Sequence, residues 1–339
     1  MSDAQRPSPT ATPSRRGSRP PGLDARSRAL GRTARSPAHI PWRGWKQVLH
    51  RAVREAGSDR VSLSASGCAF WATLSLFPAI SMVIALYGMV FDPVTVEPQL
   101  ENIRHLLPAP AFEMISERVR VLVSHPGSTL GVSLLISTAV TLWSASTGTK
   151  SLLSALNLAY EEQERRGMLA FQAVGLLMTL GAILGAILGL AILVLLPAGI
   201  SFLGLSAHTQ GLVQFGSFAA LVIFVLSALS VLYRFGPSRR VAQWHWITPG
   251  SVVATVLWLI ASLLFSFYVQ HIASFNATYG PLGAVAGIMM WFWVTAYAVL
   301  FGAELNAELE LQTAEDTTEG GPRPMGERGA FVADHVAED

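Results

Sequence analysis

The sequence predicts an all-α integral membrane protein with six transmembrane helices, both termini in the cytoplasm and disordered tails. Three observations support this fold class. Hydrophobic residues make up 51% of the 339 residues and charged residues only 14%. The mean hydropathy is +0.43. Four runs without Asp, Glu, Lys or Arg together hold 190 residues, the longest being 67. A soluble chain of this composition would place about nine charges in 67 residues, so exclusion by a hydrocarbon environment explains the runs better than chance.

Residues 1–39 are predicted to be a disordered basic tail. They are rich in Pro, Ser, Arg, Ala and Thr and lack apolar periodicity, so they cannot bury enough surface to offset the entropy of ordering. Residues 313–339, an acidic tail, are predicted to be disordered for the same reason. The first apolar run starts too late in the chain for a cleavable signal peptide, so we expect it to be retained as an anchor.

Residues 40–60 are predicted to form an interfacial amphipathic helix. Apolar residues, among them Trp42, Trp45 and Leu49, recur at helical spacing, whereas basic residues such as Arg43 and Arg54 occupy other faces. This pattern is typical of a helix that lies among lipid headgroups, with tryptophans at the boundary and arginines toward anionic lipid.

Six spans are predicted within a membrane domain at residues 61–312. A span needs about 20 apolar residues, so the two longest runs must each divide, one at Pro197 and the polar stretch 206–210, the other at 271–281. The spans are then residues 64–90, 130–149, 171–196, 212–233, 247–269 and 282–303. Residues 92–128, between the first two spans, are expected to form two short amphipathic helices that cap the extracytoplasmic face.

The distribution of Lys and Arg predicts the orientation. With six spans, 21 of the 24 Lys and Arg residues fall on one side of the membrane, and only Arg104, Arg118 and Arg120 fall on the other. The positive-inside rule therefore places both termini in the cytoplasm.

Small residues and one proline mark points of helix packing. Gly181, Gly185 and Gly189 lie four residues apart, a spacing that lets helix backbones approach closely, and Gly283 and Gly287 repeat it in the last span. Pro78 must interrupt the hydrogen-bond ladder of the first span, and a kink that packs is favoured over a site made from a broken helix. The single cysteine, Cys68, excludes an internal disulfide framework and is interpreted as a small buried thiol.

Polar residues near two predicted span ends suggest a gate. Lys150, Asn157 and Glu161 would share one face of a helix continuing from the second span, and Glu304 follows the sixth span at the same membrane boundary. Our hypothesis is that Lys150 and Glu304 form part of a cytoplasmic gate, with Asn157 and Asn306 as neutral partners. The alternative is that Lys150 reaches the headgroups and Glu304 is solvated.

Three stretches resemble the YihY/BrkB family of bacterial inner-membrane proteins, some of them once labelled ribonuclease BN. They are Ala69–Pro78, Gly148–Tyr160, and Tyr279–Gly283 followed by Trp291 and Gly302–Asn306. Their order and spacing suit one membrane domain over residues 45–310. The resemblance implies six spans and a bacterial plasma membrane, but no settled activity. The candidate functional positions are Pro78, Lys150, Asn157, Tyr160, Glu161, Tyr279, Gly280, Gly283, Glu304 and Asn306.

An enzyme is the weakest of the functions considered. Metal-dependent cleavage of phosphodiesters needs convergent carboxylates or histidines, and no two of the eight histidines have the i, i+4 spacing of metal ligands on a helix. Glu161, Glu162 and Glu164 lie beside two arginines, which is typical of a solvated helix end. We therefore predict no catalytic residue, cofactor or metal.

Two functions stay open: transport or permeation, which we favour, and a non-catalytic envelope scaffold. The predicted span centres contain no ionisable group, which argues against a proton relay of buried carboxylates. Passage of a neutral or lipid-like substrate, or of ions along hydroxyls such as Thr138 and Ser146, remains compatible. Expected partners are membrane lipids and a substrate of unknown identity, with self-association left open and no specific nucleic acid.

Overall fold

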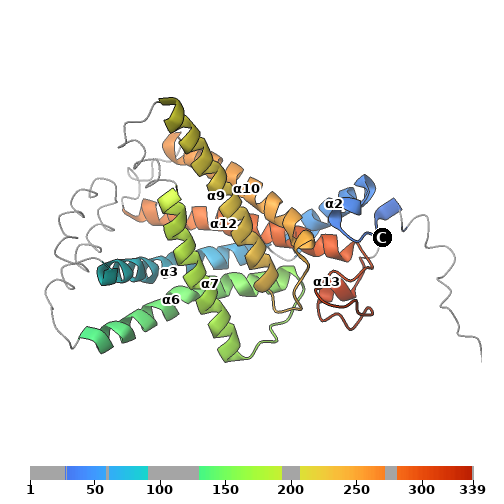
Figure 1. Cartoon of the computed structure of the whole chain (residues 1–339), viewed down its shortest axis with the longest axis horizontal. Coiled ribbons are helices and arrows are strands. Elements are labelled where there is room, and N and C mark those ends of the chain that lie inside the picture. Colours follow the sequence, from blue (N-terminus) through green and yellow to red (C-terminus); the bar gives the residue numbers. More distant parts are fainter. Residues whose placement is uncertain are drawn as a thin grey trace, which may run out of the picture.

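The computed structural model describes residues 27, 29–58, 61–90, 130–192, 207–271 and 281–337 (Figure 1). The regular elements of these residues are helices. A short 3-10 helix, η1 (Pro37–His39), precedes α2. The longer helices are α2 (Trp42–Ser58), α3 (Val61–Val90), α6 (Leu130–Ala159), α7 (Met168–Leu190), α9 (Ala207–Phe235), α10 (Trp244–His271) and α12 (Pro281–Leu311), and a last turn, α13, is Phe331–Asp334. The predicted extracytoplasmic helices at 92–128 lie outside the described residues.

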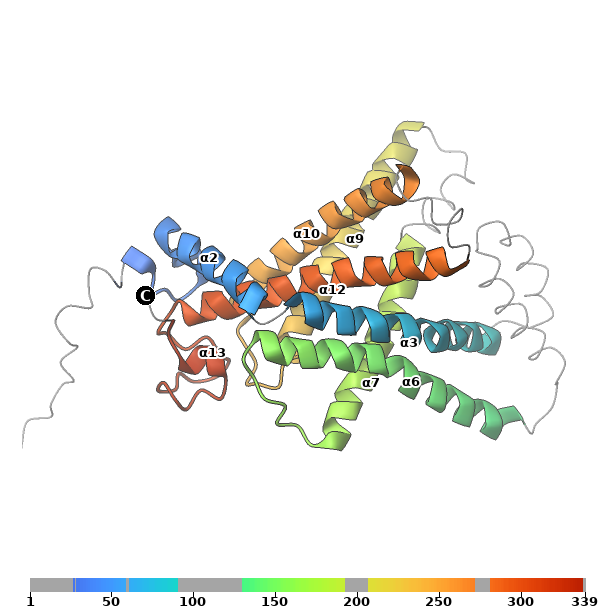
Figure 2. The ribbon, with the colours of Figure 1, turned by 180° about the vertical axis from the view of Figure 1, so that it is seen from behind.

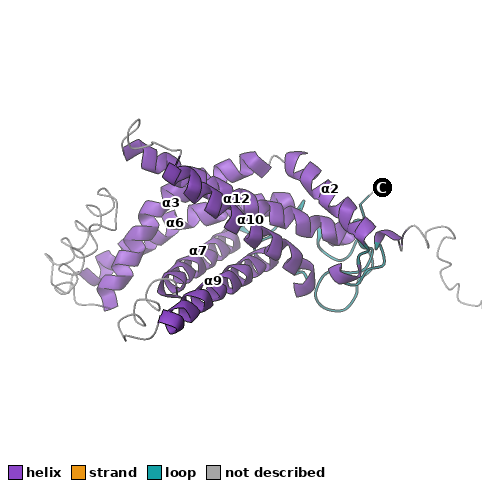
Figure 3. Cartoon of the chain, turned by 90° about the horizontal axis from the view of Figure 1, so that it is seen from above, coloured by secondary structure: helices purple, strands orange, loops and turns teal. Residues whose placement is uncertain are grey.

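The long helices form one bundle. α3 packs on α6 and α12, α12 on α10, α10 on α9, and α6 on α7. Seen from behind, α3, α6 and α12 run side by side along the long axis, while α7 and α9 cross them obliquely (Figure 2). From above, α7 and α9 lie next to each other (Figure 3), and their contact links the two outer helices.

The bundle turns apolar side chains outward, as a membrane protein does. Among the described residues, α7, α9, α10 and α12 each contain a stretch long and apolar enough to cross a membrane, and only 17–28% of each apolar window is buried inside the protein. Leu177, Ile223 and Leu263 are among the exposed side chains. An apolar surface of this extent is stable in lipid rather than in water. The first two predicted spans fall in α3 and α6, and the count of six remains a prediction.

Glycines allow close contact in two helix pairs, α10 with α12 and α7 with α9. A Cβ added to Gly250 of α10 would lie 2.1 Å from the carbonyl oxygen of Gly302 in α12. A Cβ added to Gly185 would lie 2.8 Å from the ring of Phe224 in α9. The predicted glycine ladder therefore packs at Gly185, whereas a Cβ on Gly181 would meet no described atom within 4 Å.

The predicted disorder of the acidic tail is wrong for residues 313–337, which we call the cap. The side chain of Arg328 donates to the carbonyl oxygens of Ala314, Glu315 and Ala333. The carboxylate of Asp334 accepts the amides of residues 326, 328 and 329. Composition predicted disorder because the segment is polar, but its polar groups satisfy one another and the end of the bundle.

The predicted disorder of residues 1–39 is also wrong at its C-terminal end. Ala34 and Pro37 are buried, and the amide of Ala314 donates to the carbonyl oxygen of Arg32 at 2.8 Å. The hydroxyl of Thr313 donates to the carbonyl oxygen of Ala34 at 2.6 Å. The start of the cap therefore orders this segment through hydrogen bonds. Composition alone does not predict such long-range bonds.

Helix α2 is present as predicted, and one of its faces packs on the end of α12. Gly44, Val48, Ala52 and Ala56 form the buried face. Trp42 is 75% exposed on the other side. An interfacial position for this outer face remains a prediction.

Candidate functional site

Buried polar side chains gather at one end of the bundle, where α6 ends, the α9–α10 loop (236–243) turns and the last turns of α12 meet the cap. We call this region the polar end. Its members come from segments far apart in the chain, so the fold alone brings them together. The buried or networked polar residues there are Asn157, Tyr160, Glu162, Glu164, Arg166, Ser238, Arg239, Glu304, Asn306, Glu310 and Thr317.

The end of α6 decides which glutamate turns inward. Glu161 has φ +53°, and the amide of Glu162 donates to the carbonyl oxygen of Asn157 at 2.8 Å. The amide of Glu161 donates to the carbonyl oxygen of Leu158 at 3.0 Å. These bonds define a Schellman motif whose left-handed position is usually glycine. The turn leaves Glu161 exposed and buries Glu162.

The predicted shared face of Lys150, Asn157 and Glu161 is therefore wrong at its last member. The helix ends at Ala159, and Glu161 belongs to the turn that follows. Asn157 is buried as a member of the polar end.

Asn157 joins the α6–α7 loop to the α9–α10 loop. Its Nδ2 donates to Glu164 Oε2 at 2.9 Å, and its Oδ1 accepts the amide of Ser238 at 2.7 Å. Arg166 donates from Nε to Glu164 Oε1 at 2.8 Å and from Nη2 to the carbonyl oxygen of Gly236 at 2.9 Å. Burial acts to raise the pKa of Glu164, but the hydrogen bonds from Arg166 and Asn157 outweigh it and lower the pKa to about 2.

Arg239 forms the most deeply buried ion pair of the polar end. Its Nη2 lies 2.6 Å from Glu310 Oε1, and both side chains are 0% exposed. The second oxygen of Glu310 accepts the hydroxyl of Thr317 at 2.5 Å. The guanidinium carbon lies 4.5 Å from the ring centroid of Tyr160, so the cation also stacks on an aromatic face. A loop, a helix end and the cap thus share one charge pair.

Glu162 brings a second carboxylate toward the same arginine. Its Oε1 accepts the amide of Phe331 at 2.6 Å, and its Oε2 lies 3.6 Å from Arg165 Nη2. Burial raises the pKa of Glu162, and the amide of Phe331 and the charge of Arg239 oppose that rise.

Asn306 ties α12 to α10 beside Pro249, a proline inside that helix. Pro249 has no amide hydrogen to donate within the helix. The side chain of Asn306 accepts the amide of Gly250 at 2.8 Å and donates to the carbonyl oxygen of Ile247 at 3.1 Å. This bidentate bridge lies one turn from the contact of Gly250 with Gly302, so close packing and polar recognition coincide there.

Tyr160 and Glu304 complete the interior of the polar end. Tyr160 is 0% exposed and Glu304 is buried. Burial raises the pKa of the Tyr160 hydroxyl, Arg239 opposes the rise, and the carboxylates of Glu310 and Glu304 add to it. The phenol is therefore neutral at physiological pH.

Lys150 faces α7. Its Nζ donates to Gln172 Oε1 at 2.8 Å and lies 5.1 Å from the ring centroid of Trp143. The side-chain stem crosses Gly175, where an added Cβ would lie 2.7 Å from Lys150 Cγ. The hypothesised ion pair with Glu304 is not formed between these two described side chains.

The remaining predicted positions divide into two groups. Pro78 is half-buried within α3, which continues as one helix on both sides of it. Gly283 is buried near the start of α12. Tyr279 and Gly280 lie outside the described residues.

Two of the stretches that carry the family resemblance pack directly on each other. The amide of Gly148 donates to Ser75 Oγ at 3.0 Å, and an added Cβ on Gly148 would lie 3.1 Å from Ala72 Cα. Ser151 Oγ lies 3.7 Å from the sulfur of the buried Cys68. The motifs in α3 and α6 thus define a close helix contact.

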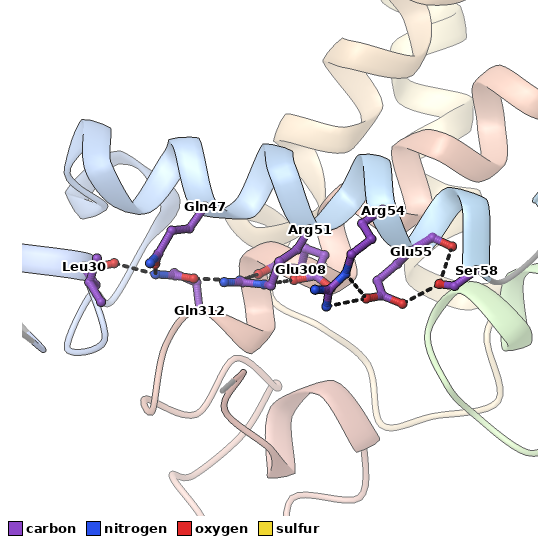
Figure 4. A network of polar contacts seen from close by, with 8 residues as sticks. All are labelled: Leu30, Gln47, Arg51, Arg54, Glu55, Ser58, Glu308 and Gln312. Carbon is purple, nitrogen blue, oxygen red and sulfur yellow. Dashed lines mark hydrogen bonds and ion pairs between the residues drawn. The ribbon is translucent and has the colours of Figure 1, made fainter. Parts of the chain in front are cut away.

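A second polar network lies on the other side of the end of α12 (Figure 4). Arg51 of α2 pairs with Glu308 at 2.5 Å and donates from Nη2 to Gln312 Oε1 at 2.7 Å. Gln312 in turn donates to the carbonyl oxygen of Leu30 at 2.7 Å. Arg51 belongs to the basic residues of this helix that were expected to face anionic lipid. In the structure it instead bonds to Glu308 and Gln312 within the protein.

Sequence reasoning missed Arg239, Glu310, Glu162 and Ser238. Arg239 counted only as a positive-inside charge, and Glu162 as part of a solvated helix end. One available signal was the run Glu304–Gln312, in which three glutamates alternate with leucines on a helix that continues from a span. Such a run cannot place every glutamate in water.

The chemistry available at the polar end is hydrogen bonding and charge pairing. Among the described residues, no three His, Cys, Asp or Glu side chains converge as metal ligands. The described groups instead hold loops and helix ends to one another.

Comparison with known proteins shows what the chain is similar to. A family model described as "Virulence factor BrkB" matches residues 52–325. YfkH of Bacillus subtilis (strain 168), whose name describes it as ribonuclease-like, is 28% identical over 278 residues, which cover 78% of this chain and 94% of YfkH. A UPF0761 membrane protein of Photobacterium profundum is 29% identical over 266 residues, covering 77% of this chain and 79% of the relative.

A third relative is similar to the chain over a comparable length. A UPF0761 membrane protein of Alteromonas mediterranea is 26% identical over 281 residues, covering 80% of this chain and 91% of that protein. No solved structure matches the chain.

Proposed function

The chain belongs to the virulence factor BrkB family of membrane proteins, and on that premise we propose that it is a six-span protein of the bacterial inner membrane that lets a small substrate cross. The polar end is its cytoplasmic closure. The gate suggested by the sequence keeps Asn157, Glu304 and Asn306 in this proposal, and Arg239 takes the place assigned to Lys150.

The fully buried pair of Arg239 with Glu310 carries the proposal. Removing two charges from water costs several kcal/mol per ion, and well-packed apolar residues are often as stable as such a pair. A contact that never opens therefore gains little stability from a buried ion pair. A closure that must open and reform in one register gains specificity, which is the best-attested use of buried polar groups.

The charge distribution supports the orientation. Of the 24 Lys and Arg residues, 21 lie on the side of the polar end if the chain spans six times. Alkaline phosphatase fused after residue 110 should be active, and fusions after residues 160 and 237 should be inactive. Activity at residue 160 or 237 would contradict the six-span topology.

Flux measurements test the substrate path. Proteoliposomes would be challenged with neutral polyols, read as swelling, and with potassium chloride, read by a potassium-sensitive dye. We expect the double substitution Arg239→Met with Glu310→Leu to stay folded and to change the flux of the conducted solute by about tenfold, equivalent to about 1.4 kcal/mol.

The matched control is the ion pair between Arg51 of α2 and Glu308 of α12. Arg51→Met with Glu308→Leu removes the neighbouring ion pair and should leave flux near that of the unmodified protein. If no solute moves faster through vesicles with protein than through empty ones, the alternative, an envelope scaffold, replaces the transport proposal. If the Arg239→Met, Glu310→Leu variant shows the same flux as the control variant, Arg239 and Glu310 do not form part of the closure.

A further inference from the structure

We propose that the cap, residues 313–337, is a latch that holds the α6–α7 and α9–α10 loops together and releases them as one unit when the polar end opens. What the opening achieves rests on the proposed transport function. The latch itself is a property of the fold and has its own test.

The cap touches both loops through its C-terminal part. The amide of Phe331 donates to the carboxylate of Glu162 in the α6–α7 loop at 2.6 Å. Two residues earlier, the carbonyl oxygen of Gly329 accepts the amide of Arg240 in the α9–α10 loop at 2.9 Å. One short stretch of cap therefore spans the two loops.

A second attachment lies near the start of the cap. The amide of Gln243 donates to the carbonyl oxygen of Thr317 at 2.9 Å, and the amide of Glu319 donates to that of Val241 at 2.9 Å. Thr318 forms an antiparallel bridge with Ala242 between them. The α9–α10 loop is thus held at two points, with the α6–α7 loop fastened beside one of them.

The cap also completes the hydrogen bonding of the groups around Arg239. Thr317 donates its hydroxyl to Glu310, and Phe331 donates its amide to Glu162. Both carboxylates interact electrostatically with Arg239. Release of the cap would remove one hydrogen bond from each carboxylate and admit water to the pair, so the closure and the cap are coupled.

The composition of the attachment favours release as a unit. Val332 is fully buried, but the other most deeply buried side chains of the cap belong to alanines and threonines, such as Ala333 and Thr317. Hydrogen bonds contribute modestly because water replaces them, and segments with few buried apolar contacts open at lower free energy than the core. The family match ends at residue 325, so α13 lies beyond it.

A disulfide can lock the latch. A Cβ built on Gly329 lies 3.7 Å from the Cβ of Arg240, within the range of about 3.5–4.5 Å found in disulfides. The test variant is Arg240→Cys with Gly329→Cys in a chain carrying Cys68→Ala. Gly329 has φ +72°, and the resulting strain falls on both the reduced and the oxidised forms, so their comparison isolates the lock.

Hydrogen exchange of the full-length protein in lipid nanodiscs reads the result. We expect oxidation to slow exchange about tenfold in the cap and in residues 160–167 and 236–243 together, with the middle of α10 unchanged as internal reference. If oxidation slows the cap alone, the loops do not depend on it and the latch is wrong.

The opposite perturbation is Val332→Asp, which should release the cap and speed exchange in both loops. A released cap with loops exchanging at the unmodified rate would also overturn the proposal. If this variant does not fold, the disulfide comparison decides. Absence of solute flux in the unmodified protein would contradict the transport function and leave the exchange result standing.

Discussion

A buried glutamate pairs with an arginine on each of two sides of the end of α12, but different segments cover the two pairs. Glu308 and Glu310 are two residues apart, which places them on nearly opposite faces of the helix, and each pairs with an arginine from a distant segment. The pair of Arg51 with Glu308 is covered by α2, and its side chains are 13% and 6% exposed. The pair of Arg239 with Glu310 is covered by a loop and the cap, and both side chains are 0% exposed.

The segments that cover each pair, not α12 itself, set the electrostatic cost of burying it. Under α2 the side chain of Arg51 keeps some contact with water, whereas the loop and the cap leave that of Arg239 none. Removing one partner from a pair costs more when the remaining charge has no route to water. The effects of substitutions should therefore follow the order of burial.

The largest effect is expected for Glu310→Ala. It leaves the buried Arg239 without its ion-pair partner and with only the weaker electrostatic interaction with Glu162, which should lower the free energy of unfolding by about 3–5 kcal/mol. Thermal unfolding in detergent would measure the loss. Adding Arg239→Met and placing Leu at position 310 should recover most of it, and failure of that recovery would mean that the charges are not the cause.

A smaller effect is expected for Arg51→Ala. Its charged hydrogen bonds to Glu308 and Gln312 are nearer to solvent, so we expect a loss of about 1–3 kcal/mol in the same assay. Arg54→Ala is the matched control because Arg54 is a largely exposed neighbour whose ion pair, with Glu55, lies within α2, and it should change little. A loss for Arg51→Ala as large as that for Glu310→Ala would break the order by burial.

A pH-dependent effect is expected at the rim of the polar end. The pKa of Glu164 is lowered from its ordinary value of 4.5 to about 2, so its carboxylate stabilises the fold above pH 4.5 and the contribution is lost as the pH falls through 2. Glu164→Gln should remove this part of the pH dependence. Melting temperatures of the two proteins between pH 6 and pH 2 would differ most at the higher pH, and parallel curves would argue against the assignment.

The smallest effect is expected for Glu161→Gly, beside the buried Glu162. Glu161 occupies a left-handed conformation that costs a residue with a Cβ about 1 kcal/mol. Glycine should relieve this strain but also remove an interaction that Glu161 makes, so we expect the free energy of unfolding to change by less than about 1 kcal/mol in either direction. Thermal unfolding in detergent would measure the change, and a loss greater than this would show that the side chain of Glu161 contributes more than the strain costs.

Much of the polar end could be anticipated from the sequence, but not its pairing. Asn157, Glu304 and Asn306 were predicted near one boundary and do lie buried at one end, as does Tyr160, another candidate position. Lys150 was predicted with them and instead contacts Gln172. The partner that the sequence did not suggest, Arg239, comes from the α9–α10 loop, where the neighbouring Arg240 has the same local appearance.

The tails show the same limit. Their composition offers few residues for an apolar core, yet the cap folds because its polar groups find partners on the bundle and Val332 joins the core of the bundle. Arg328 and Asp334 satisfy the turns of the cap, and Thr317 and Phe331 reach carboxylates from other elements. The carboxylates of Glu310 and Glu162 lie outside the segment from which disorder was inferred.

By itself, the sequence determined that the chain is a helical membrane protein. Lipid excludes charge and obliges each spanning segment to satisfy its own backbone hydrogen bonds, and both requirements act on contiguous residues. Only the tertiary structure decided which charges are buried and what they pair with. Arg239 and Glu310 are 71 residues apart, and a charge loses its water only when such distant segments close over it, which no local pattern records.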